Sequence, residues 1–125
     1  MSILFKQRRR AHSVNVQCEF YHRAKQNGLT PFAEYKHLNS RFDIVLIANG
    51  YIFAIVEIKN YLDPNREHRN VKQLNKYKGY NTPVFLCRNF DDIDPIIDRC
   101  KELEQRYLNA IATNQFGGRG AILYY

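Results

Sequence analysis

The stretch from residue 41 to residue 60, RFDIVLIANGYIFAIVEIKN, most restricts how this chain can fold. Asn49-Gly50 separates two runs rich in β-branched and aromatic residues, and this pattern is typical of a β-hairpin. The carboxylates of the stretch are Asp43 near its beginning and Glu57 near its end, and Lys59 follows two positions later. An apolar hairpin that carries these charges must place them where something compensates for their burial.

The length of the hairpin loop decides where the charges point. A two-residue turn would pair Ala48 with Tyr51. Asp43 would then lie beside Val56, and Glu57 would point to the opposite face, because side chains on a strand alternate. This register scatters the charged groups over both faces of the hairpin.

A three-residue loop gives a different register. With residues 48–50 in the loop and Gly50 left-handed in a bulge, Ile47 would pair with Tyr51. Both acids and Lys59 would then share one face. We expect this loop, because it is the one that gathers the charges.

The rest of the chain predicts a mixed α/β sheet flanked by helices, in the order α-β-β-β-α-β-α. Ser13 is a candidate helix cap and Asn27-Gly28 a candidate helix stop. We predict helices over 13–26, 70–79 and 91–111, and strands over 32–36, 41–48, 51–59 and 82–87. The expected organisation is a basic N-terminal arm over 1–12, a core domain over 13–112, and a C-terminal tail or edge strand over 113–125.

The charge of the chain favours a polyanionic partner. The 125 residues carry 19 Lys and Arg against 12 Asp and Glu, a net charge of +7. Nucleic acid is the first expectation and a membrane surface the second. The basic residues cluster, and those expected to contact phosphates are Arg8, Arg9, Arg10, Arg66, Arg69, Lys72, Lys76 and Lys78.

The chain contains no apolar run long enough to span a bilayer and no secretory signal pattern, so a cytoplasmic protein is expected. Its three cysteines, Cys18, Cys87 and Cys100, form no CxxC pair. Their apolar neighbours predict buried free thiols.

Two interpretations of the acidic pair remain open. Lys59 and Arg41 could neutralise Asp43 and Glu57 in an ion-pair network. Alternatively, the two carboxylates hold a divalent cation with hard oxygen ligands, for which Mg²⁺ is the usual choice.

Asp43, thirteen intervening residues and then Glu57-Ile58-Lys59 resemble the D…ExK motif of the PD-(D/E)xK nuclease superfamily. Phe42 stands where the family name has proline. The later pair Gln73 and Tyr77 resembles the pattern of RecB-like nucleases and of the nuclease domains of type I restriction subunits. The resemblance implies a stand-alone nuclease core with the restriction-endonuclease-like fold.

The resemblance also implies roles for these residues. Asp43, Glu57 and the Ile58 carbonyl would bind Mg²⁺, with Mn²⁺ as a substitute, and Lys59 would orient the attacking water. Glu19 would add a further acid, although an ion pair with Arg23 is an equal alternative. The other residues implied to take part are Gln73 and Tyr77, which would contact the DNA backbone or support the lysine.

The expected function is therefore a Mg²⁺-dependent DNA endonuclease. It would act as a homodimer if both strands are cut. A nuclease similar to the Holliday-junction resolvases and a non-catalytic DNA-binding module on the same fold are the alternatives.

Overall fold

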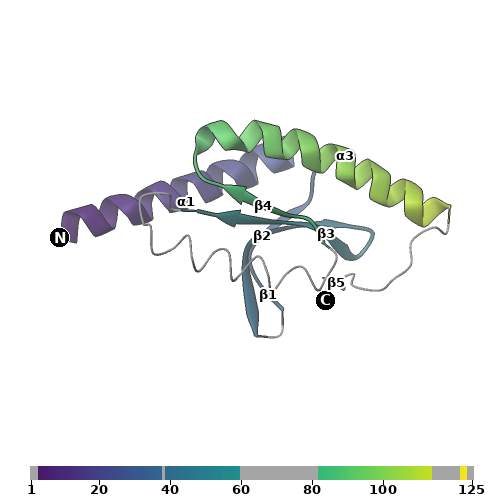
Figure 1. Cartoon of the computed structure of the whole chain (residues 1–125), viewed down its shortest axis with the longest axis horizontal. Helices are drawn as coiled ribbons and strands as arrows, with labels where there is room; N and C mark the ends of the chain where they lie inside the picture. Colours follow the sequence, from purple (N-terminus) through teal and green to yellow (C-terminus); the bar gives the residue numbers. More distant parts are fainter. Residues whose placement is uncertain (1–2, 38, 60–81, 114–121, 124–125) are drawn as a thin grey trace.

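The computed structural model describes residues 3–37, 39–59, 82–113 and 122–123, with side chains from residue 12 to residue 113 within these ranges. Figure 1 shows a sheet with two long helices on one of its faces. The described elements confirm the mixed α/β architecture. The predicted helix over 70–79 lies outside the described residues.

The first helix, α1, covers Ile3–Gln26. The prediction that it begins at Ser13 is wrong, because the helix starts ten residues earlier. Residues 3–12 are mostly Lys, Arg, Gln, Ala and Leu, which favour helix, and no Gly or Pro interrupts them. The residues predicted as a basic arm are therefore largely the first turns of α1.

α1 ends at the Asn27-Gly28 stop that the sequence predicts. Gly28 has φ +80°, Leu29 N–H donates to the Ala24 carbonyl at 3.0 Å, and Gly28 N–H donates to the Lys25 carbonyl at 3.1 Å. These two bonds are those of a Schellman motif, in which a left-handed glycine ends the helix.

The sheet has the strand order β1-β2-β3-β4. The first three strands pair antiparallel, and β3 pairs parallel with β4. The short β5 pairs antiparallel with the beginning of β3, so the tail supplies the edge strand that was one of the two expectations. The strands are β1 Pro31–His37, β2 Ser40–Ala48, β3 Tyr51–Ile58, β4 Val84–Cys87 and β5 Ile122–Leu123.

The helix α3, Ile93–Ala112, follows the short 3₁₀ helix η2, Phe90–Asp92. Together α1 and α3 cover one face of the sheet (Figure 1), and their apolar residues join those of the strands in one core cluster. The helical residues buried in this cluster are Val16, Phe20, Ala24, Ile93, Ile96, Ile97 and Cys100.

A second cluster lies on the other face of the sheet. It contains Phe42, Val45, Ile47, Ile52 and Ile55, with Tyr35 and Val84 packed against it. The central strands β2 and β3 are therefore apolar on both faces, which explains their nearly continuous hydrophobic sequence.

The cysteines follow the prediction in part. Cys87 and Cys100 are buried free thiols, and burial raises the pKa of each to about 12. Cys18 is exposed, so its predicted burial is wrong. The neighbouring helical residues Val16 and Phe20 are buried against the sheet. Cys18 is two residues from each of them, which is a rotation of about 200° around the helix axis, so its side chain points away from the sheet. None of the described helices combines the length and the hydropathy of a membrane span.

Candidate functional site

The β2–β3 hairpin has a two-residue turn. Asn49 and Gly50 both have positive φ, 51° and 79°, and Ala48 pairs with Tyr51. The predicted three-residue loop is wrong, because Asn49 tolerates the left-handed conformation and completes a tight turn with Gly50. With this turn alone, Glu57 would point away from Asp43.

A bulge in β3 brings Asp43 and Glu57 back to the same face of the sheet. Ile47 pairs with Ile52 and Leu46 pairs with Ala54, so Phe53 is an extra residue in β3. One inserted residue shifts the register and reverses the side-chain alternation beyond it.

The last pair of this ladder is Ile44 and Val56, and the next residues along the two strands are Asp43 and Glu57. The two acids therefore stand opposite each other. Val56 and Ile58 face the helical side of the sheet. Because side chains alternate, Glu57 and Lys59 both point to the other face.

Asp43 lies where β2 separates from β3. Ile55 N–H and Lys59 N–H donate to β4 carbonyls, at 2.9 Å and 2.8 Å. Because donors alternate along a strand, Ile58 N–H points to the other side, toward β2. There it donates to Asp43 Oδ2 at 2.8 Å, so a carboxylate takes the place of a backbone acceptor. Asp43 thus sits in a fork between two diverging strands.

The Ile58 carbonyl belongs to the same fork. In an extended strand the N–H and C=O of one residue point to the same side, so this carbonyl also faces β2. Three oxygen-bearing groups therefore belong to the fork by the strand register: the Asp43 carboxylate, the opposite Glu57 and the Ile58 carbonyl.

Glu57 and Lys59 are deeply buried, each 5% exposed. No acid among the described residues lies within ion-pair distance of the Lys59 ammonium, and no described cation pairs with Asp43. Within the described residues, the arrangement therefore lacks the ion pairs with Lys59 that the network interpretation requires.

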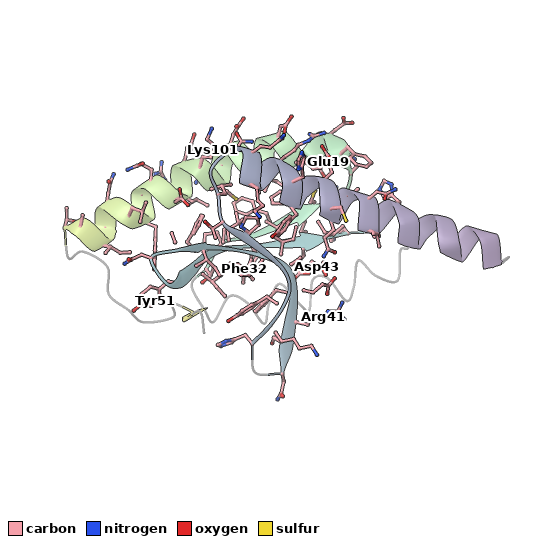
Figure 2. The ribbon with its side chains drawn as sticks, turned by 180° about the vertical axis from the view of Figure 1, so that it is seen from behind. Glu19, Phe32, Arg41, Asp43, Tyr51 and Lys101 are labelled. Atoms are coloured by element: carbon pink, nitrogen blue, oxygen red, sulfur yellow. The ribbon has the colours of Figure 1, made fainter. Side chains whose placement is uncertain are left out.

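Arg41, the other candidate counter-ion, pairs with a different acid. Its Nε donates to Glu34 Oε2 at 2.6 Å, and its Nη2 forms an ion pair with the same oxygen. Arg41 and Asp43 both lie on the part of β2 that bends away from the helices (Figure 2).

Glu34 marks the bend in the β1–β2 pair. Its φ of 53° is unusual for a residue other than glycine. In the β1–β2 ladder, Ala33 pairs with Ile44, and Tyr35 pairs with Phe42. Glu34 and Asp43 lie between these pairs, opposite each other, but they do not pair. The strained residue therefore lies at the level of the fork.

Gln17 connects α1 to this bend. Its Nε2 donates to Glu34 Oε1 at 3.1 Å and to the Asp43 carbonyl at 3.4 Å. Burial alone would raise the pKa of Glu34, but hydrogen bonds from Gln17 and Arg41, with the Arg41 charge, lower it. Gln17 and Glu34 are not among the site residues predicted from the sequence. No local pattern distinguishes either one.

Glu19 does not join the fork. It accepts a hydrogen bond from Arg23 Nε at 2.7 Å, and Arg23 also reaches Asp94 at 3.2 Å. Figure 2 shows Glu19 and Asp43 on opposite sides of α1 in that view. The structure therefore contains the Glu19–Arg23 ion pair, which was the alternative to a role of Glu19 at the metal. Over the described residues, no group of three or more His, Cys, Asp or Glu side chains could hold a metal ion.

Several predicted site residues fall elsewhere. Arg8, Arg9 and Arg10 lie in the helical backbone of α1, in the part without described side chains. The other candidates lie outside the described residues: Arg66, Arg69, Lys72, Gln73, Lys76, Tyr77 and Lys78.

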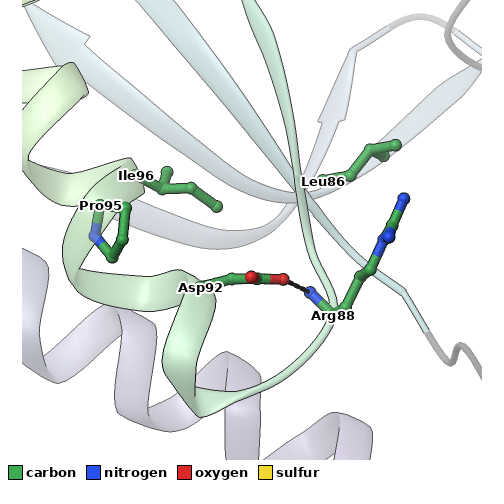
Figure 3. Close-up of a pocket in the computed structure, with 5 residues that line it drawn as sticks. All are labelled: Leu86, Arg88, Asp92, Pro95 and Ile96. Atoms are coloured by element: carbon green, nitrogen blue, oxygen red, sulfur yellow. Dashed lines mark hydrogen bonds between the residues drawn. The ribbon is translucent and has the colours of Figure 1, made fainter.

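A pocket of about 230 Å³ opens at the C-terminal end of β4. Figure 3 shows Asp92 Oδ2 accepting a hydrogen bond from the backbone N–H of Arg88, at 2.9 Å. The residues that line the pocket are Leu86, Arg88, Asp92, Pro95 and Ile96.

Comparison of the chain with protein-family models, with curated proteins and with solved structures finds no match. Any functional assignment therefore depends on the residues of the fork and on their surroundings.

Proposed function

We propose that the chain is a Mg²⁺-dependent DNA endonuclease with a restriction-endonuclease-like fold. The observation that supports this most is the fork at the end of the β2–β3 ladder. There Asp43 and Glu57 stand opposite each other, and the buried Lys59 shares a face with Glu57.

The donor set of the fork fits a hard divalent cation. Asp43, Glu57 and the Ile58 carbonyl offer oxygen ligands, and Mg²⁺ in proteins is commonly held by one or two carboxylates together with substrate phosphate. When bound, Mg²⁺ would polarise the scissile phosphate as a Lewis acid. Glu19 is left out of this proposal, because it pairs with Arg23.

The protein's own groups would supply the remaining chemistry. Hydrolysis forms a bond from a water oxygen to phosphorus, breaks the bond from phosphorus to a sugar oxygen, and delivers a proton to that leaving oxygen. The Lys59 ammonium would orient the water and offset the negative charge that grows on the phosphate. A phosphate is a suitable partner for a buried cation that has no ion pair with the described residues.

The test is cleavage of linear, nicked and four-way DNA by the purified chain with Mg²⁺, Mn²⁺ or EDTA. We expect cleavage with either metal and none with EDTA. Glu57→Gln should reduce the cleavage rate by at least about 100-fold, because it removes a metal ligand that stabilises the transition state. DNA affinity should stay the same, because this interaction adds little to binding of the uncleaved substrate. Glu19→Gln is the matched control, an acid of the same charge paired away from the fork.

The outcomes separate the alternatives. Preference for four-way DNA would indicate a resolvase-like, homodimeric enzyme, whereas cutting of linear duplex would indicate a general endonuclease. DNA binding without cleavage in Mn²⁺ would leave a non-catalytic binding module. In metal-free buffer, Glu57→Gln should raise the melting temperature, because it relieves repulsion between two acids. A large decrease would instead indicate a structural ion pair.

A further inference from the structure

We propose that Arg41 and Lys36, on the β1–β2 pair beside the fork, bind a second phosphate of the nucleic-acid strand, close to the phosphate that is cleaved. Glu34 holds the Arg41 guanidinium in place for this contact. The inference rests on the proposed nuclease function and adds to it a phosphate contact outside the basic residues predicted from the sequence. The occupant is the backbone of a nucleic acid, bound through its phosphate and not through its bases.

Arg41 and Lys36 form a pair of cations on one face of the β1–β2 ladder. They are direct partners in the antiparallel register, so their side chains lie side by side. Both are exposed, and Lys36 forms no ion pair with a described residue. Like charges directly opposite each other destabilise a strand pair. A phosphate between the two side chains would remove this repulsion, because it forms charge-assisted hydrogen bonds with both.

Glu34 orients the Arg41 guanidinium. Its Oε2 accepts a hydrogen bond from Arg41 Nε at 2.6 Å and also pairs with Nη2. Its other oxygen, Oε1, accepts from Gln17 of α1 at 3.1 Å, so the carboxylate is itself held in place. A guanidinium has five N–H donors, and therefore one that is held by a carboxylate can bind a phosphate as well.

The backbone of Glu34 supports a functional role for its side chain. Its φ of 53° is a conformation that glycine adopts without strain. Strained residues of this kind are found at functional sites, where the side chain is needed in spite of its strain. Here the group that glycine lacks is the carboxylate that holds Arg41.

The position of Arg41 relative to the fork suits a neighbouring phosphate. Arg41 is two residues from Asp43 on β2, about 7 Å along the strand (Figure 2). Gln17 Nε2 also donates to the Asp43 carbonyl at 3.4 Å, so the carboxylate that holds Arg41 lies beside the Asp43 backbone. Phosphates of one DNA strand follow each other about every 3.4 Å along the duplex axis. A strand with one phosphate at the fork therefore has another within reach of Arg41.

The first experiment measures binding of a labelled DNA duplex in EDTA, by fluorescence anisotropy over a range of salt concentrations. We expect Arg41→Gln and Lys36→Gln each to reduce the slope of log K against log salt by about 0.9. The controls are Arg99→Gln, an exposed arginine that also pairs with an acid, and Lys25→Gln, an exposed lysine over the Tyr21 ring. Both controls should leave the slope unchanged.

The second experiment tests the role of Glu34. Glu34→Gly removes the carboxylate, relieves the backbone strain and raises the net charge by one, so charge alone would strengthen DNA binding. We expect binding to weaken several-fold instead, because Arg41 is no longer held. Equal or tighter binding would overturn the oriented site, as would unchanged salt slopes in Arg41→Gln and Lys36→Gln. Lys36 is exposed, so Lys36→Gln keeps the test decisive if Glu34→Gly does not fold.

The third experiment relates the contact to cleavage. A methylphosphonate linkage, which carries no charge, is placed in turn at each position next to the cut. We expect one position at which it slows cleavage by the original chain several-fold and does not slow cleavage by Arg41→Gln any further. Equal slowing of both chains at every position would overturn the contact. Reduced salt slopes without cleavage in Mg²⁺ or Mn²⁺ would keep the phosphate site and remove the nuclease assignment.

Discussion

Lys59 carries a positive charge at a buried position directly after the C-terminal end of β3. It is 5% exposed, and no described acid pairs with its ammonium. Burying a charge costs free energy unless a group of opposite charge compensates for it. This arrangement is useful if an anionic substrate completes it.

Replacing Lys59 by methionine separates function from stability. Lys59→Met keeps the length of the side chain and removes the buried charge, so we expect an unchanged or higher melting temperature. The cleavage rate should fall by about 100-fold or more, because charge stabilisation at the phosphate is lost. Calorimetry and a cleavage assay measure the two effects.

Lys25→Met serves as the control, since Lys25 is exposed and lies over the Tyr21 ring, away from the fork. A melting temperature that falls by many degrees in Lys59→Met alone would mean that the ammonium is structural.

Glu34 should make stability depend on pH. Its pKa lies below the ordinary value of 4.5, so the unfolded chain binds its proton more readily. This contribution is complete above about pH 4.5 and is lost as the pH falls through the lower folded pKa. Glu34→Gln removes it.

The measurement is urea unfolding of both chains at pH 7 and at pH 3. We expect the difference in unfolding free energy to be below about 1 kcal/mol at pH 7, because the pair with Arg41 is partly exposed, and to shrink at pH 3. A difference that grows in acid would contradict the lowered pKa.

At the scale of elements, the site depends on two irregularities of one hairpin. The Asn49-Gly50 turn sets one register, and the extra Phe53 shifts it, so that Asp43 meets Glu57. The helix α1 contributes through Gln17, which bonds to Glu34 and to the Asp43 carbonyl. A helix, a turn and a bulge together position one carboxylate.

Two glycines test the local geometry at the ends of these elements. Gly28 and Gly50 have φ of +80° and +79°, and a Cβ added at either would meet nothing within 4 Å. Alanine at either position should therefore reduce the unfolding free energy by about 1–2 kcal/mol, from backbone strain alone. Denaturant unfolding measures this.

The two alanine variants differ in what they should do to activity. Gly50→Ala acts on the hairpin that carries the fork, and so should lower cleavage, whereas Gly28→Ala should leave it nearly unchanged. Equal activities after correction for the folded fraction would show that the turn does not control the fork.

At the scale of the whole molecule, the net charge of +7 lies partly on the long helix α1, whose N-terminal half includes Arg8–Arg10. In Figure 1 this half extends beyond the end of β4, close to the start of α3. A helix that projects beyond the sheet can follow a nucleic-acid backbone outside the proposed cleavage site.

The expected consequence is a salt-dependent affinity. Each phosphate contact contributes about 0.9 to the slope of log K against log salt. Replacing Arg8, Arg9 and Arg10 together by glutamine should reduce this slope by about 2–3, equally for all DNA sequences. Fluorescence anisotropy between 50 and 300 mM salt is the measurement, with Arg99→Gln as control. An unchanged slope would exclude the helix from the interface.

Most of the elements could be predicted from the sequence, because their signals are local. The Asn-Gly turn lies between two β-rich runs, the apolar spacing predicts α3, and Gly28 follows α1 where its helical pattern ends. The spacing of Asp43, Glu57 and Lys59 also singled out the candidate site before any contact was known.

Only the tertiary structure decided how that site is assembled. The bulge lies at Phe53. The Phe53 ring stacks on the ring of Tyr107 in α3, with 6.2 Å between the two ring centroids. Gln17 donates a hydrogen bond to Glu34, and Glu19 pairs with Arg23, which also reaches Asp94. These contacts join side chains that are far apart in the sequence. Contacts between two elements do not produce a periodic pattern in the sequence of either element, so the sequence alone could not predict them. Local patterns therefore indicated which residues could form a site, and packing between elements determined which of them meet.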